Sequence, residues 1–146
     1  MPRYIIIVKA PEANTDGCAI ASKADMFESI GKFNAELVAA GAMLGGEGLR
    51  PSANEGYRVH FQGSGGAEPR VEKGPFPSEN LMSGWWIIKA KDGEEALGWA
   101  KKIPFTEGHV ELRRISEMDD FDGVMTAEQK ERELKLCADM KAQLQK

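Results

Sequence analysis

The chain has 146 residues, of which 42% are hydrophobic and 29% are charged, and its formal net charge is −4. This length fits one domain with a full-sized core and room for one terminal appendage. The acidic balance and the absence of a Lys/Arg run argue against a nucleic-acid-binding protein. No apolar stretch approaches the length needed to span a bilayer. We therefore expect neither nucleic-acid nor membrane partners.

The N-terminus and the cysteines indicate a reducing, intracellular setting. The first apolar run is too short for a signal-peptide core and no small-residue cleavage site follows it. Cys18 and Cys137 lie far apart and lack the CxxC spacing, so we expect reduced thiols. We expect a cytoplasmic protein.

The first third of the chain predicts a strand, a loop and a helix. The run Tyr4–Val8 is nearly continuously apolar, which is typical of a central strand covered on both faces. A loop is expected over residues 10–21. A helix should begin near Ser22 and end at Gly41. Its apolar stripe, at helical spacing, comprises Phe27, Ile30, Leu37 and Val38, with Phe33 or Asn34 at the middle turn.

The middle of the chain predicts a glycine-rich strand and a hairpin. Residues 42–50 contain three glycines, and glycine inside a strand often marks a bulge or a close backbone approach. Residues 57–62 alternate strictly between apolar and polar side chains, as a half-buried strand does. Residues 69–73 form its partner strand after a flexible loop. We interpret this hairpin as an excursion from a simpler core.

The stretch from Val71 to Ala90 organises the second half. Its apolar run Trp85-Trp86-Ile87-Ile88 is either a buried strand or a very short helix, and its length and composition favour the strand. A helix with Asp92 as N-cap should follow and end at Pro104. We expect its buried stripe to comprise Ala96, Leu97 and Ala100.

The C-terminal part predicts one more core strand and a separate helix. Residues 109–115 alternate and form the last core strand, and residues 118–121 leave the domain. Thr126 and Gln129 form a capping box that opens a helix to about Gln145. Its thin apolar stripe, which would dock weakly on its own domain or on a partner subunit, comprises Leu134, Cys137, Met140 and Leu144.

The order of these elements predicts the fold class. A strand, helix, strand, hairpin, strand, helix and strand in succession correspond to an α+β, ferredoxin-like βαββαβ fold with an inserted β-hairpin. Its antiparallel sheet would carry both helices on one face and leave the other face open. We place this domain at residues 1–122 and a C-terminal helical extension at residues 123–146.

Strand alternation predicts a polar site on the open face. If the apolar side chains face the helices, the opposite face gathers charged residues from two strands and both histidines of the chain lie near acidic and guanidinium groups. The alternative is that these residues form the solvated side of a sheet, which is the commoner reason for charged residues at alternate positions of a strand. The predicted catalytic residues are His60 and Glu111, and the predicted ligand-binding residues are Glu47, Arg58, Trp86 and Arg113.

Other candidate sites are weaker. No helix follows Gly45–Gly48, so close strand packing is a better interpretation than a phosphate loop. Trp85 and Trp86 point to opposite faces, so that one belongs to the core and the other lines a pocket or a subunit contact. Cys137 is expected to pack, and Cys18 has no nearby base that would make it a nucleophile. No metal ion or cofactor is expected.

Several motifs, in order, resemble the YCII-related group that is often called DGPF-domain proteins. The resemblance covers roughly residues 1–122. It rests on Tyr4–Lys9, Phe33–Leu37, Ala40-Gly41, Gly46–Leu49, Gly74-Pro75-Phe76, Gly84-Trp85-Trp86, Val110–Arg113 and Glu117–Phe121.

The resemblance implies a ferredoxin-like domain that dimerises through its open sheet face into a dimeric α+β barrel, and it carries over no established activity. Two positions depart from the family pattern. Lys73 stands where the family usually has the Asp of its DGPF motif, and residues 77–81 replace its usual acidic segment. Either this member has lost an activity or the motif is structural, and the suitability of Gly74 and Pro75 for a turn favours the structural role.

Two functions are compatible with these patterns. The first is a small-molecule-binding homodimer, with an enzyme as one form of it, in which a His/carboxylate pair acts as general acid-base and arginines anchor a polar or anionic ligand. The second is a non-catalytic assembly or protein-interaction module, with a regulatory role as one form. The missing Asp and the C-terminal helix favour the second.

Overall fold

The computed structural model describes residues 1–9, 20–77, 79, 81–106 and 108–146, and the side chains of residues 20–24 are not among the parts described. Two compact units are present, Met1–Arg114 and Ile115–Lys146. Cys18 and most of the loop predicted over residues 10–21 lie outside the described residues. The division predicted after residue 122 stays a prediction.

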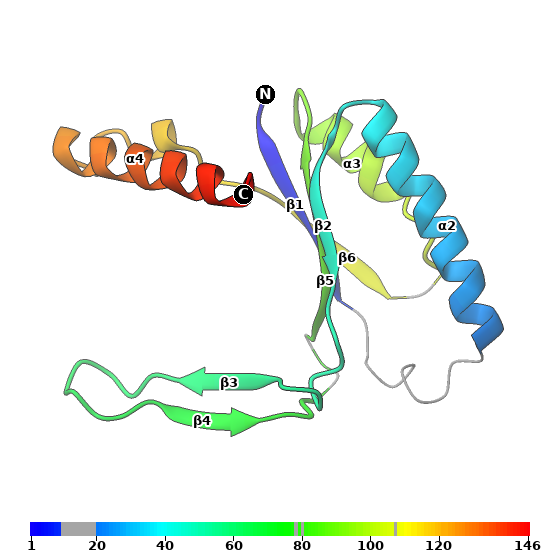
Figure 1. The fold of residues 1–146 in the computed structure, drawn as a ribbon, viewed down its shortest axis with the longest axis horizontal. Coiled ribbons are helices and arrows are strands. Elements are labelled where there is room, and N and C mark those ends of the chain that lie inside the picture. The colour runs from blue at the N-terminus through cyan, green and yellow to red at the C-terminus, as the bar shows by residue number, and fades with distance from the viewer. Residues whose placement is uncertain (10–19, 78, 80, 107) are drawn as a thin grey trace. The chain divides into compact units, whose positions relative to one another are not determined.

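The first unit is built on a four-stranded antiparallel sheet with helices on one face (Figure 1). The strand order is β2-β5-β1-β6, which is the ferredoxin-like arrangement that the element order predicts. The strands are β1 (Arg3–Lys9), β2 (Met43–Gly48), β5 (Met82–Lys89) and β6 (His109–Arg114). The helices are α2 (Ile20–Ala39) and α3 (Gly93–Lys101).

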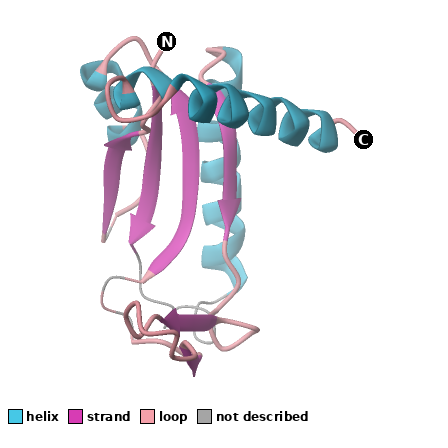
Figure 2. Cartoon of the chain, turned by 90° about the vertical axis from the view of Figure 1, so that its left-hand side faces the viewer, coloured by secondary structure: helices cyan, strands magenta, loops and turns pink. Residues whose placement is uncertain are grey.

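Strand β1 is central, and its burial explains its apolar sequence. Tyr4, Ile6 and Val8 are buried, whereas Ile5 and Ile7 are half-buried on the other face. Figure 2 looks onto that other face and shows the four strands side by side with helices of the same unit behind them. The sequence of β1 is therefore apolar at nearly every position because alternate residues lie on two faces that both require apolar side chains.

The N-cap of α3 matches the predicted signal. However, α2 begins at Ile20, so Ser22, the predicted start, lies inside the helix, and parts of the predicted stripes are wrong. The Asp92 side chain accepts a hydrogen bond from the backbone N–H of Glu95 at 2.9 Å, as an N-cap does. Phe33 and Leu37 are buried, but Phe27 and Val38 are exposed, because α2 contacts the sheet along a narrower stripe than predicted. Similarly, Leu97 of α3 is exposed, and Trp99 packs against the core instead.

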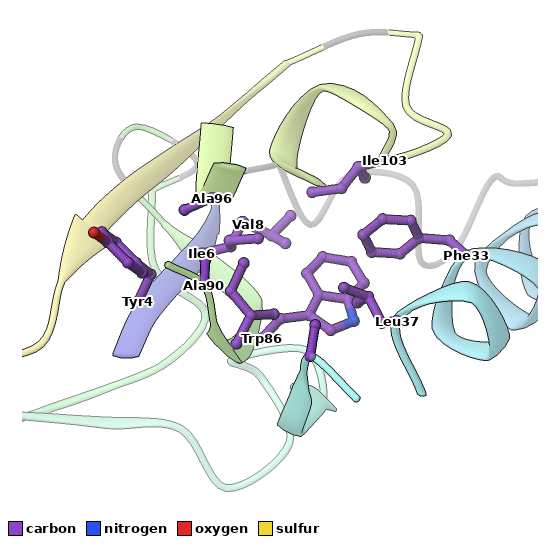
Figure 3. Packing of buried hydrophobic residues seen from close by; sticks show 11 residues of the cluster. Tyr4, Ile6, Val8, Phe33, Leu37, Trp86, Ala90, Ala96 and Ile103 are labelled. Carbon is purple, nitrogen blue, oxygen red and sulfur yellow. The ribbon is translucent and has the colours of Figure 1, made fainter. Parts of the chain in front are cut away.

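The indole of Trp86 lies at the centre of the contact between sheet and helix (Figure 3). It is only 6% exposed, and its ring meets that of Phe33 edge-on with centroids 5.5 Å apart. Its Nε1–H donates to Oδ1 of Asn34 at 2.9 Å. Aromatic edge-to-face contact and a satisfied indole N–H together hold β5 against α2.

The glycines of β2 permit this packing. The register of β2 against β5 shifts between Met43 and Gly45, and a Cβ on Gly46 would lie 2.8 Å from Cδ1 of Trp86. Both the bulge and the close approach that the glycine-rich sequence predicts are thus confirmed.

The predicted hairpin is present as a separate two-stranded sheet, β3 (Tyr57–His60) and β4 (Arg70–Lys73). It projects on the side of the four-stranded sheet that faces away from α2 and α3 (Figure 1). At its base Phe76 N–H donates to Oγ of the buried Ser52 at 2.9 Å, and a Cβ on Gly74 would overlap the Ser52 carbonyl. The Gly-Pro-Phe motif therefore closes the base of the hairpin, which supports a structural role for it.

The second unit contains the 3₁₀ helix η1 (Met118–Phe121) and the helix α4 (Ala127–Leu144). The capping box of Thr126 and Gln129 is confirmed, with hydrogen bonds of 2.8 and 3.2 Å. Lys130 Nζ donates to Asp122 at 2.8 Å, and this bond raises the pKa of the lysine. The apolar stripe of α4 is exposed, so the prediction that Cys137 is packed is wrong.

A membrane-crossing helix would have to be both long and apolar. No helix within the described ranges meets both conditions.

We expect Gly46→Ala to lower the free energy of unfolding by about 1–3 kcal/mol, because the new methyl group forces the packed Trp86 ring to move. Chemical denaturation measures the change. Gly48→Ala is the matched control, since a Cβ at Gly48 meets nothing within 4 Å. Equal stability of the two variants would contradict this account of Trp86 packing.

Candidate functional site

The structure divides the predicted site residues between two sheets. Glu111 and Arg113 lie on β6, on the open face of the four-stranded sheet, whereas Arg58 and His60 lie on β3 of the hairpin. The expectation that these four side chains share one sheet face is therefore wrong. It failed because the hairpin strand, although correctly predicted to alternate, pairs only with β4 among the described strands.

The hairpin nevertheless contains a His/carboxylate pair flanked by arginines. His60 Nε2 lies 2.8 Å from Oε2 of Glu72. Glu72 is directly opposite Arg58 in the strand register, and Arg70 is directly opposite His60. The Arg58 guanidinium stacks on the Phe76 ring, with its central carbon 4.2 Å from the ring centroid.

The electrostatics of this cluster stabilise a charged carboxylate. The hydrogen bond from His60 lowers the pKa of Glu72, and the positive charges of Arg58 and Arg70 add to this effect, while partial desolvation opposes it. The partner of His60 is thus Glu72 and not the predicted Glu111. Pairing residues 57–60 with residues 70–73 as an antiparallel hairpin would have placed Glu72 beside His60 from the sequence.

The open face of the four-stranded sheet is mainly apolar at its centre. Ile7 lies between Trp85 and Glu111 in the strand register. Ile5 lies between Ile87 and Arg113. The central side chains, Ile5, Ile7, Trp85 and Ile87, are half-buried. Glu111 and Arg113 are exposed, and Arg113 Nη1 lies 3.7 Å from Glu111 Oε1. This alternation in β6 is as predicted, but it gives an apolar surface with a charged border.

A cavity of about 310 Å³ lies between α2 and the edge of the sheet formed by β2 and β5. Glu47 lines it from β2, and its Cα is paired with that of Trp85, so the glutamate shares the open face. Because β2 is an edge strand, side chains from both faces of the sheet reach the cavity. The lining comprises Val8, Met26, Phe27, Ile30, Asn34, Gly46, Glu47, Gly48, Ser83, Gly84, Trp85, Trp86 and Phe105.

Two predicted ligand-binding residues, Glu47 and Trp86, come together in this cavity. Trp86 is buried in the core and also forms part of the cavity wall, and Trp85 lines it as well. Sequence reasoning assigned one tryptophan to the core and the other to a pocket, whereas both line the pocket. It missed Asn34 and Ser83. The contact between α2 and the sheet brings Asn34 to Trp86, whereas Ser83 lines the cavity from β5 itself.

The polar groups of the cavity are few and separate. Asn34 uses its side-chain oxygen for Trp86, and its amide nitrogen makes no hydrogen bond to any residue that the structure describes. Among the described residues, no group of three or more His, Cys, Asp or Glu side chains is arranged to hold a metal ion. The lining thus offers an amide donor, a hydroxyl and a carboxylate on otherwise apolar walls.

Comparison with known proteins identifies a family for the domain. The model of the YCII-related domain matches residues 2–119, which is most of the chain and covers the four-stranded sheet, both its helices and the hairpin. No curated protein matches the chain.

We expect His60→Ala to raise the pKa of Glu72 toward its ordinary value of 4.5, because the substitution removes the hydrogen bond that lowers it most. Carboxyl-carbon NMR titration measures this pKa. A lowered pKa stabilises the fold above the ordinary pKa, and that contribution is lost as the pH falls through the folded-state value. His109→Ala, which removes the exposed histidine of β6, should leave the Glu72 titration unchanged. Equal Glu72 titration curves in the two variants would contradict the conclusion that His60 lowers the pKa of Glu72.

Proposed function

Since the chain belongs to the YCII-related family, we propose that it is a small-molecule-binding homodimer whose ligand occupies the cavity between α2 and the β2–β5 edge. The observation that carries this proposal is the cavity itself. Its volume of about 310 Å³ is at the lower end of the range typical of ligand pockets, roughly 300–1,000 Å³. Its apolar walls and few polar groups are also the usual composition of such pockets.

The polar groups suit the role of orienting a ligand. The amide nitrogen of Asn34 has no hydrogen-bond partner among the described residues, and the side chain is held in place because its oxygen accepts from Trp86. Little side-chain entropy is therefore lost when a ligand accepts from this amide. Ser83 and Glu47 supply an additional hydroxyl and a carboxylate from neighbouring strands. Each of these groups comes from a regular element, which keeps its position defined before the ligand arrives.

The proposal is one of binding rather than catalysis. No histidine lines the cavity among the described residues, and the His60–Glu72 pair lies on the hairpin. The predicted acid-base pair of His60 and Glu111 does not enter the proposal, because these residues lie in different sheets. Arg113 keeps a proposed role only at the border of the open face.

Dimerisation through the open face supports the same proposal. The central residues Ile5, Ile7 and Ile87 form an apolar surface on the side of the sheet opposite to α2 and α3. A second copy of the chain would cover this surface and build a dimeric α+β barrel, which the family resemblance also implies. Glu47 and Trp85 lie on this face too, so the interface would adjoin the cavity.

A second candidate function is a non-catalytic assembly module. It is favoured by exposed apolar side chains outside the cavity, which such a module would use for protein contacts. In the hairpin these are Tyr57, Val59, Phe61 and Val71, and in α4 they are Leu134, Leu136, Met140 and Leu144.

We expect the chain to sediment as a dimer, and Ile7→Asp to weaken that dimer by about a hundredfold or more. The substitution would bury an unpaired carboxylate under the second copy, next to Glu111 of its own chain, and burying an uncompensated charge costs several kcal/mol. Analytical ultracentrifugation over a dilution series measures the effect, with circular dichroism as a check of folding.

A chain that ends at Phe121 separates the two candidate functions. It should remain dimeric if the open face forms the interface, and it should become monomeric if α4 drives assembly. A monomeric full-length chain at every concentration would contradict the homodimer.

A thermal-shift screen against a broad metabolite library tests the cavity. A ligand that binds only the folded state raises the melting temperature by mass action. We expect Gly48→Leu to abolish this rise, because Gly48 lines the cavity and a Cβ at this position meets nothing within 4 Å, so the added side chain would fill part of the cavity.

The matched control is Gly65→Leu in the hairpin loop, where a Cβ also meets nothing within 4 Å. This variant should retain the ligand-induced rise in melting temperature. If the ligand still raises the melting temperature of the Gly48→Leu variant, the ligand binds outside the cavity.

A further inference from the structure

The cavity joins aromatic rings to a carboxylate, which is how proteins bind organic cations. We propose that its ligand is a small apolar molecule that carries a protonated amine or a quaternary ammonium group. This inference rests on the proposed function, because it concerns the same cavity. It adds the charge of the ligand, its position and the residues that select it.

Aromatic side chains contribute much of the wall. Trp85 and Trp86 come from β5, Phe27 comes from α2, and Phe105 lies just after α3. The faces of such rings carry partial negative charge, so they attract an ammonium group that lies over them while also covering apolar parts of the ligand. Tryptophan is the strongest of the aromatic residues in this respect.

Glu47 is the only charged residue in the cavity lining among the described residues. It lies beside Trp85 in the register of β2 and β5 and belongs to the exposed part of the wall. A cation over the indole of Trp85 would therefore have a carboxylate nearby. An anion would meet Glu47 with no lysine, arginine or histidine in the described lining to offset it.

The exposure of the lining residues indicates how the ligand is oriented in the cavity. Phe27 is 75% exposed and Met26 is 42% exposed, so the α2 side of the cavity presents apolar surface that nothing in the described structure covers. The Asn34 side chain, which extends from α2 to the indole of Trp86, and the Trp86 wall are less exposed. We infer that the ammonium group lies near Glu47 and that the apolar body extends along Phe27 and Trp86.

The size of the cavity selects small ligands. A volume of about 310 Å³ accepts a single ring with a short side chain but not a large cofactor. This permits a set of probes that share a phenylethyl body and differ in the charge of the terminal group: 2-phenylethylamine, 2-phenylethanol and 3-phenylpropionate. None of them absorbs like an indole, so a change in the tryptophan fluorescence, to which Trp85 and Trp86 contribute together with Trp99, reports binding.

Fluorescence titration of the full-length protein with the three probes tests the proposal. We expect 2-phenylethylamine to bind about tenfold more tightly than 2-phenylethanol, and 3-phenylpropionate to bind most weakly. Glu47→Gln should reduce the advantage of the amine over the alcohol to the part that the aromatic rings supply, and leave alcohol binding unchanged. Glu68→Gln, which removes an equal charge from the hairpin loop, should preserve that advantage.

The possible results separate this inference from the proposed function. Equal affinity for the three probes, with binding abolished by Gly48→Leu, would overturn the inference and leave the binding function intact. Preference for the amine that Glu68→Gln reduces as much as Glu47→Gln would also overturn it, because the selectivity would then come from the net charge of the protein. Failure of all three probes to bind would overturn the cavity as a site for ligands of this size, and with it both proposals.

Discussion

The placement of Trp86 is the constraint on which the rest of the domain depends. Its indole contacts Phe33 edge-on and donates to Asn34, and these contacts join the second strand of the sheet to α2. The ring fits only because Gly46 on the neighbouring strand has no Cβ. The same ring is a wall of the cavity, so the interaction that closes the core also shapes the proposed binding site.

The domain separates three surfaces with different chemistry. The helix-covered face of the sheet is the core, the opposite face has an apolar centre with a charged border, and the hairpin carries its own cluster of His60, Glu72 and two arginines. The cavity lies where the first two surfaces meet, at the edge strand β2. In a dimer that covers the open face, the interface would thus adjoin the proposed ligand site, and no residue of the hairpin would be needed.

The Gly-Pro-Phe segment serves the architecture of the domain. Gly74 and Phe76 pack around the buried Ser52 at the base of the hairpin, and Phe76 also supports the Arg58 guanidinium. Lys73, which directly precedes this segment, is exposed and paired in register with Tyr57. The packing at the base of the hairpin thus depends on the glycine and the aromatic ring.

The sequence alone determined the order and kind of the elements, because periodicity, caps and glycines act locally. The strand alternation of β6, the caps at Asp92 and Thr126, and the close approach at Gly46 were all predictable in this way. Only the tertiary structure decided which strands share a sheet. That choice moved Arg58 and His60 away from Glu111, and the packing of α2 on the sheet brought Asn34 to Trp86. Contacts between residues distant in the chain depend on which apolar surfaces pack together, and a local pattern does not carry that information.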